Sequence, residues 1–161
     1  MPDAAPAPKS LMDVSVGVAP WTHIKEVRLV NSSIRSQYQQ PSAPTDVKYS
    51  IGARTDVDRE TKQLIVHALL MSCAVGEQEP ECAKEILRIE SEFLLTYDTN
   101  LPREITDAEA DAFGKMNGIH NAWPYWREYV QSTTARLGFP PLTLPLMTGA
   151  LLLQYYAAKS P

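Results

Sequence analysis

The segment KQLIVHALLMSCAV, residues 62–75, decides the fold of this 161-residue chain. Its side chains are apolar at consecutive positions, so an extended strand here has two dry faces instead of one. The segment is also shorter than the ~20 apolar residues that a membrane-spanning helix needs. A sheet with helices on one side buries only one face of each strand. The apolar side chains on the second face of this strand therefore predict that another subunit covers that face.

Three further segments are expected to pair with this strand. Residues 24–38, IKEVRLVNSSIRSQY, are rich in β-branched side chains, and residues 47–56, VKYSIGARTD, alternate apolar with polar positions. Residues 86–97, ILRIESEFLLTY, are mixed and then apolar. Turn-forming residues separate the segments, and no helix-sized stretch lies between them. This pattern predicts hairpin links and a four-stranded antiparallel sheet.

Helical signals begin at Thr106, where the sequence TDAE has the spacing of a capping box. The Thr106 hydroxyl can accept a hydrogen bond from the amide three residues on, and the Glu109 side chain can reach back. Apolar residues then follow at helical spacing as far as Leu137. Gly118 and Pro124 are expected to interrupt or kink this helix, since proline lacks the amide donor and its ring collides with the preceding turn.

The C-terminal segment combines a rigid part with a helical part. Gly138 is expected to end the long helix, and FPPLTLPL, residues 139–146, contains three prolines that hold it extended. Residues 148–159, TGALLLQYYAAK, are expected to form a short closing helix. The predicted fold class is therefore α+β: a four-stranded antiparallel sheet, a long kinked helix, a proline-rich crossover loop and a short C-terminal helix.

Composition and the N-terminal sequence set the broad class. Residues 1–20 begin MPDAAPAPKS and are expected to form a flexible tail, which leaves residues 21–161 as a single domain. This start lacks an export signal and the chain has only two cysteines, which together predict a cytoplasmic protein. The net charge of −4 argues against nucleic acid as a partner, because binding phosphates needs clustered cations. Insertion into a membrane is not expected.

Few residues could support catalysis. His67 and Cys73 share the third strand without an obvious orienting group, so we expect His67 to be a buried or interface histidine. Glu90 and Glu92 point to one side of a strand within residues 76–111, which hold 11 acids and 3 bases. That block has two interpretations: an acidic docking face, or a solvated strand face. Since known catalytic and nucleotide-binding motifs do not occur, we predict no enzyme, no cofactor and no metal site.

The distinctive feature of the sequence is apolar and aromatic. Seven of its thirteen aromatic residues lie between Trp123 and Tyr156. Aromatic side chains on a helix usually pack in a core, whereas a proline-stiffened apolar loop can bind an extended chain with little loss of entropy. Both interpretations stay open. The candidate client-binding residues are Tyr125, Trp126, Phe139, Leu142, Leu144, Leu146, Leu152, Tyr155 and Tyr156.

Residues 121–157 resemble the SecB family of protein-export chaperones. The family's helix carries an apolar-Pro-Tyr-x-Arg-Glu sequence, which stands here as WPYWRE at residues 123–128. Its crossover pattern R-x-x-F/L-P-x-L-x-L stands here as RLGFPPLTL at residues 136–144. The resemblance implies a homotetramer, built as a dimer of dimers. It also implies that unfolded polypeptides are held, without ATP, in surface grooves near the crossover loop and the closing helix.

Two positions depart from the family pattern. Gly149 stands where an aromatic residue is expected, which implies a shallower pocket, and Arg88 stands near an acidic residue that docks the translocase ATPase. The phrases REYV, RL and PPLTL are closer to the SecB-like chaperones of tripartite toxin–antitoxin–chaperone systems. The resemblance therefore implies preproteins or an aggregation-prone antitoxin as clients, and the translocase ATPase as a further partner that Arg88 makes less favourable.

Two hypotheses of other classes remain beside the chaperone. The chain could be a dedicated interaction partner of a single protein, with no general chaperone activity. It could also be a small enzyme or a ligand-binding protein that uses a pocket around His120, Tyr125 and Trp126. Suppression of aggregation of several unrelated proteins would favour the general chaperone over the dedicated partner. Turnover of a tightly bound small molecule would favour the enzyme or ligand-binding protein.

Overall fold

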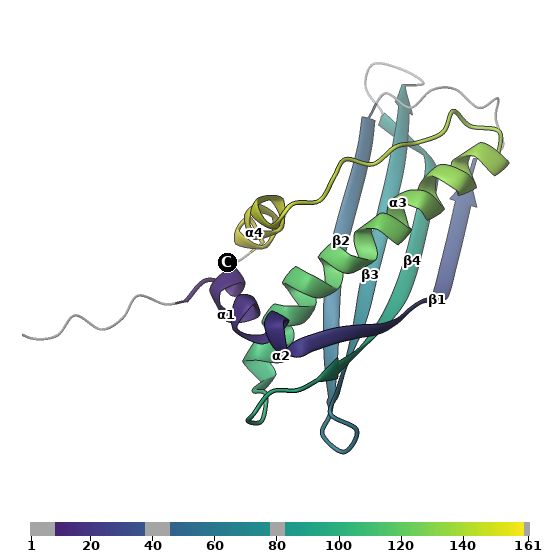
Figure 1. Ribbon diagram of the computed structural model, residues 1–161. Coiled ribbons are helices and arrows are strands. Elements are labelled where there is room, and N and C mark those ends of the chain that lie inside the picture. The colour runs from purple at the N-terminus through teal and green to yellow at the C-terminus, as the bar shows by residue number, and fades with distance from the viewer. Residues whose placement is uncertain (1–8, 38–45, 78–82, 160–161) are drawn as a thin grey trace, which may run out of the picture.

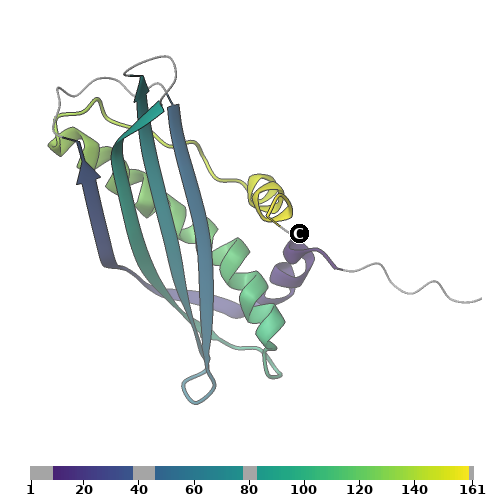
Figure 2. The same ribbon diagram turned by 180° about the vertical axis from the view of Figure 1, so that it is seen from behind.

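The sheet at the centre of the fold has the predicted four antiparallel strands. The computed structural model describes residues 9–37, 46–77 and 83–159 of the chain. The strands are β1 (Thr22–Ser36), β2 (Asp46–Asp58), β3 (Gln63–Glu77) and β4 (Ala83–Thr99). Their order in the sheet is β1-β4-β3-β2, so β1 and β2 are the two edges. Helix α3 (Ile119–Arg136) crosses one face of the sheet, as Figure 1 and the reverse view in Figure 2 show.

The register between β3 and β4 determines which side chains form the core. Every second residue of each strand faces the helices and is buried. On β3 these residues include Leu64, Val66 and Ala68, which pair with Tyr97, Leu95 and Phe93 of β4. The alternate residues of β3 face the other way. There Ile65 and Met71 are partly buried, and Leu69 is 50% exposed. The second face of β3 is thus apolar, as the sequence predicts, and Leu69 remains open to solvent in the single chain.

The flexible tail expected over residues 1–20 is corrected for its second half. Residues 1–8 lie outside the described ranges, but helix α1 (Leu11–Val18) and a 3-10 turn (Ala19–Trp21) follow. Ser10 accepts a hydrogen bond from the amide of Asp13, whose carboxylate accepts from the Ser10 amide in return. Val18 is fully buried. The capping box thus closes the first turn of this helix, and Val18, the buried Ser15 and the partly buried Leu11 and Met12 pack it against the domain.

The long helical segment begins where the capping box predicts. Thr106 caps helix α2 (Asp107–Phe113), which continues through a π-helical segment (Gly114–Gly118) into α3. The irregular turn thus includes Gly118, as expected. Pro124 does not interrupt the helix, because this proline lies inside α3. The kink expected there as the alternative stays a prediction. Because proline has no amide hydrogen, the carbonyl group of His120 lacks its helical hydrogen bond. Both His120 and Pro124 are exposed, so water can donate that bond instead.

The two glycines that bound the π-helical segment let the helix backbone lie directly on the sheet. A Cβ atom added at Gly118 would stand 2.5 Å from Cγ1 of Val66 on β3. A Cβ atom at Gly114 would collide with Oγ1 of Thr55 on β2. Contacts this short do not occur between real atoms, so any side chain here would push the helix away from the sheet.

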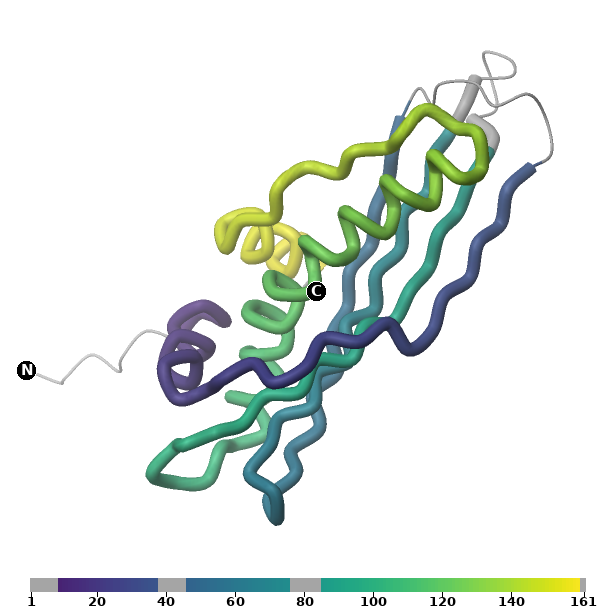
Figure 3. The backbone as a smooth tube through the Cα atoms, turned by 45° about the vertical axis from the view of Figure 1, so that its right-hand side comes forward, coloured from purple at the N-terminus to yellow at the C-terminus, as the bar shows by residue number. Residues whose placement is uncertain are grey.

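Gly138 ends α3, as predicted. It adopts φ 79°, a left-handed conformation that glycine reaches without a Cβ clash. Its amide donates to the carbonyl of Ala135 at 3.1 Å, and the amide of Phe139 donates to the carbonyl of Thr134 at 3.0 Å. This pair of bonds is the Schellman motif. The chain then runs extended beside α3 to the closing helix α4 (Gly149–Ala157), as the tube in Figure 3 shows.

Candidate client-binding surface

The crossover loop, residues 139–148, is fixed to α3 along its length. Three side chains of the helix bond its main chain: Thr134 Oγ1 accepts from the amide of Leu142 (3.0 Å), Arg127 Nε donates to the carbonyl of Leu144 (2.8 Å), and Trp123 Nε1 donates to the carbonyl of Pro145 (2.8 Å). The loop is therefore a scaffold of defined shape rather than a slack connection. Its side chains are presented in fixed directions.

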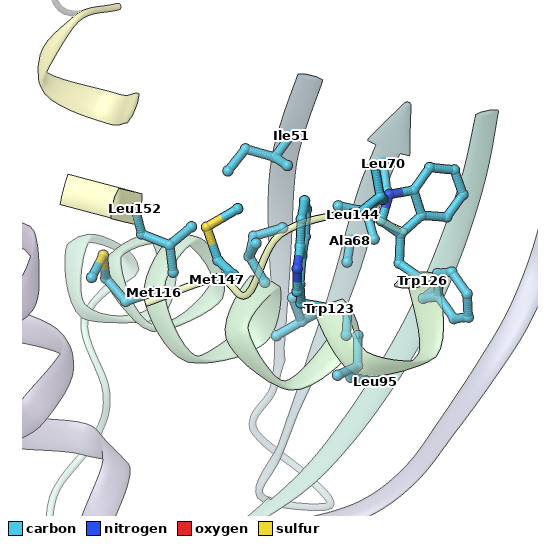
Figure 4. Close-up of a cluster of buried hydrophobic side chains, with 14 of the residues drawn as sticks. Ile51, Ala68, Leu70, Leu95, Met116, Trp123, Trp126, Leu144, Met147 and Leu152 are labelled. Carbon is cyan, nitrogen blue, oxygen red and sulfur yellow. The ribbon is translucent and has the colours of Figure 1, made fainter. Parts of the chain in front are cut away.

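Four of the nine candidate client-binding residues lie in the chain's own core. Trp126, Leu144 and Leu152 are fully buried, and Phe139 is 9% exposed. Figure 4 shows Leu144 and Leu152 among Trp123, Met147 and the side chains of the sheet. The core interpretation therefore holds for these four residues in this conformation. Their burial leaves the remaining five as the accessible part of the predicted site.

Three consecutive elements, α3, the crossover loop and α4, carry exposed apolar side chains. Leu146 on the loop is 70% exposed, and Tyr125 on α3 is 50% exposed. Leu142, Tyr155 and Tyr156 are partly buried. Leu151 on α4, at 39% exposed, was not among the sequence candidates, because three consecutive leucines do not reveal which one faces outward. We call Tyr125, Leu142, Leu146 and Leu151 the crossover surface.

A hollow of about 260 Å³ lies between α1, the π-helical segment and α4. It is lined by Met12, Ser15, Val16, Met116, Asn117, His120, Gly149 and Leu152. A Cβ atom at Gly149 would meet Cε of Met12, the flexible end of a side chain that α1 places beside α4. His120 lines this hollow, whereas Tyr125 and Trp126 do not. This hollow therefore does not unite the three residues of the suggested small-molecule pocket, which stays a hypothesis.

The carboxylates of Glu90 and Glu92 share the sheet face opposite α3, as expected, and line a hollow of about 430 Å³ beside Leu69. Both have positively charged or hydrogen-bonding partners. Arg88 Nη1 lies 3.3 Å from Glu90, and His67 Nδ1 lies 2.6 Å from Glu92. The acidic docking face stays a prediction, and the charge of Arg88 reduces the negative charge that it offers.

His67 and Cys73 do not form a nucleophilic pair. They are six positions apart on one strand, which separates them by roughly 20 Å. Burial and the nearby carboxylate of Glu85 raise the pKa of Cys73 to about 11, so its thiol is protonated and unreactive at neutral pH. In the described ranges, His, Cys, Asp and Glu side chains form no group of three that could hold a metal ion.

The comparisons with known proteins agree with this architecture. No protein-family model matches the chain. Two curated relatives from Mycobacterium tuberculosis, the SecB-like chaperone Rv1957 of strain H37Rv and the SecB-like chaperone MT2006 of strain CDC 1551, are each 23% identical over 154 residues. Each match covers 86% of this chain and 84% of the relative. The resemblance to SecB-like chaperones is confirmed.

The SecB-like fold is also found in a solved structure. The structure of Rv1957 in complex with a ChAD peptide from the HigA1 antitoxin Rv1956 matches with a TM-score of 0.72 at 23% identity. The match covers 86% of this chain and 98% of that one. The SecB-like fold thus includes the sheet, the long helix and the short C-terminal helix described above. Within the described ranges, no helix combines the length and the hydropathy that crossing a membrane requires.

Proposed function

We propose that this SecB-like chain is an ATP-independent holdase, which binds unfolded or aggregation-prone polypeptides on its crossover surface. The observation that carries the proposal is Leu146, a large apolar side chain left 70% exposed on a loop that three hydrogen bonds fix in place. Burying one leucine side chain in a complex contributes about 1.5–3 kcal/mol. Because the loop is already rigid, little of this gain is lost in ordering it.

Clients in this proposal are extended segments that expose apolar side chains. The complex of Rv1957 with an antitoxin peptide supports polypeptide clients and favours an antitoxin among them. Preproteins awaiting export are the second proposed class of client, with docking to the translocase ATPase through Glu90 and Glu92. Localisation in the cytoplasm is part of the same proposal. Release needs no nucleotide, because a client leaves when it folds or passes to its partner.

The test is suppression of aggregation of several unrelated denatured proteins, measured by light scattering without ATP. We expect suppression by the wild-type chain and a loss of about tenfold or more in client affinity for Leu146→Ser. The matched control is Leu69→Ser, which removes an equally large exposed side chain from the other sheet face and should keep full activity. Binding of a single client only would support the dedicated partner instead, and equal losses in both variants would contradict the proposed surface.

The proposal includes assembly into a homotetramer as a dimer of dimers. Strand β1 supports it, because this edge of the sheet is 15 residues long and leaves Ile24, Leu29, Val30 and Ile34 exposed. A long apolar edge invites aggregation unless another strand covers it. We propose that a second copy pairs with β1, and that two such dimers then form the tetramer.

We expect light scattering at micromolar concentration to give a mass four times the 17.9 kDa of one chain. The double variant Leu29→Lys/Ile34→Lys should give a smaller species, because two charges at the paired edge would lose their hydration. Lys25, which is already charged and exposed on β1, provides the control as Lys25→Arg and should leave the mass unchanged. A wild-type mass of one chain would contradict the assembly.

A further inference from the structure

The free edge of strand β2 is covered at one point by a side chain that imitates a neighbouring strand. The amide of Ile51 donates to the hydroxyl of Tyr155 on α4 at 2.9 Å, and this hydroxyl donates to the carbonyl of Ile51 at 3.1 Å. In an antiparallel pair, one residue exchanges both of these bonds with the residue opposite. A single hydroxyl oxygen therefore makes the two contacts that the backbone of an added strand would make.

Other contacts hold the Tyr155 hydroxyl at the edge. Lys159, one helical turn further along, donates to the same oxygen, and its Nζ atom lies 4.4 Å from the centroid of the Tyr155 ring. The hydroxyl thus donates to Ile51 and accepts from Ile51 and Lys159, and Ser50 Oγ lies 3.4 Å from the same oxygen. The ring also packs edge-on against Tyr156, with centroids 5.4 Å apart. This full set of bonds stabilises α4 against β2.

The neighbouring main-chain groups along the free edge of β2 have no such hydrogen-bond partner among the described residues. Strand alternation directs the main-chain groups of Tyr49 and Ala53 to the same side as those of Ile51. From the described ranges, no hydrogen bond reaches them from outside the sheet. Unpaired groups at a sheet edge are a template for another extended chain. The contact at Ile51, which α4 carries, occupies the middle of this template.

We propose that Tyr155 is a latch on a strand-addition site: an extended client backbone pairs with the edge of β2 only after the Tyr155 hydroxyl releases Ile51. The inference rests on the proposed holdase function and adds its regulation. The latch lowers the apparent affinity for extended chains by the fraction of molecules in which it is open. It also protects β2 from pairing with the edges of other copies while no client is present.

The variant Tyr155→Phe tests the latch, because it removes one oxygen atom and keeps the ring. The probes are a fluorescent peptide with alternating apolar and polar side chains, and a twin in which every second amide is N-methylated so that it cannot pair with a strand. We expect the variant to bind the plain peptide about tenfold more tightly than the wild type, as loss of two competing hydrogen bonds implies. We expect no gain for the methylated twin.

The matched control is Tyr97→Phe. The hydroxyl of Tyr97 accepts a hydrogen bond from Asn121 at 3.1 Å, and its residue lies on β4, away from the β2 edge. This variant should bind both peptides as the wild type does. If Tyr155→Phe does not fold, Lys159→Met offers the same test by removing one bond to the hydroxyl, with a smaller gain in the same direction.

The outcomes separate the latch from the holdase. Equal affinities of wild type and variant for the plain peptide would overturn the latch, and the holdase would stand if the wild type still suppresses aggregation. An equal gain for both peptides would also overturn it, because the hydroxyl would then guard a side-chain surface and not a strand edge. Failure of every variant to bind either peptide, together with no suppression of aggregation, would remove both proposals.

Discussion

Replacing Trp126 with alanine is expected to lower the free energy of unfolding by about 3–5 kcal/mol. This side chain is fully buried, and its ring stacks on Tyr129 with centroids 6.2 Å apart. The loss combines the transfer of the indole from water with the cavity that it leaves. It is a large part of the 5–15 kcal/mol that stabilises a typical domain. Urea denaturation followed by circular dichroism measures the change.

Trp126→Phe is the informative control for this substitution. The indole Nε1 atom of Trp126 is buried and has no hydrogen-bond partner among the described residues. Phenylalanine keeps a ring in the core and removes this unpaired donor, so the two effects offset each other and the loss should be much smaller. Unchanged stability of Trp126→Ala with weakened client binding would contradict the core position and return Trp126 to the client surface.

The double variant Gly114→Ala/Gly118→Ala is expected to have the second large effect on stability. Each added methyl group would collide with a β-branched residue of the sheet, Thr55 or Val66, whose short side chain cannot move aside. Overpacking of this kind costs about 1–3 kcal/mol per site, and the helix can relieve it only by leaving the sheet. Thermal unfolding of the double variant and of each single variant measures the cost and its additivity.

The control for these glycines lies on α1. A Cβ atom at Gly17 would meet nothing within 4 Å, so Gly17→Ala should be neutral or should stabilise the chain by up to about 1 kcal/mol, as alanine favours helix. If Gly118→Ala were as stable as Gly17→Ala, the helix would not lie as close to β3 as the structure places it, and the role of the π-helical segment would be wrong.

The sheet was predictable from the sequence because its information is local. Each strand has turn residues at its ends, and alternation or β-branching marks it as extended. The capping box at Thr106 and the stop at Gly138 were likewise readable, since each depends on hydrogen bonds within a few residues. Helix α1 was missed because its signal is a single turn, Ser10 to Asp13, after a proline-rich start.

The client-binding residues could be predicted only in part, for a physical reason. Leu142, Leu144 and Leu146 alternate along an extended loop and would share one side of it, yet Leu144 is buried and Leu146 is 70% exposed. Hydrogen bonds from Arg127 and Trp123 hold the loop on α3 at Leu144 and Pro145, between the buried and the exposed leucine. Such bonds join positions about twenty residues apart, and spacing within the loop does not encode them. The hydroxyl of Tyr155 on the β2 edge is another long-range contact of this kind.

The most direct measurement of the central claim is site-specific crosslinking to an unfolded client. A photoreactive group would be attached to cysteine at Leu146→Cys or, as the control, at Leu69→Cys, in the Cys73→Ser/Cys82→Ser background. We expect an unfolded client to crosslink strongly at position 146 and weakly at position 69. Addition of the same protein in its native folded state should not reduce crosslinking at either position. Crosslinking that is equal at the two positions, or confined to position 69, would contradict the assignment of client binding to the crossover surface.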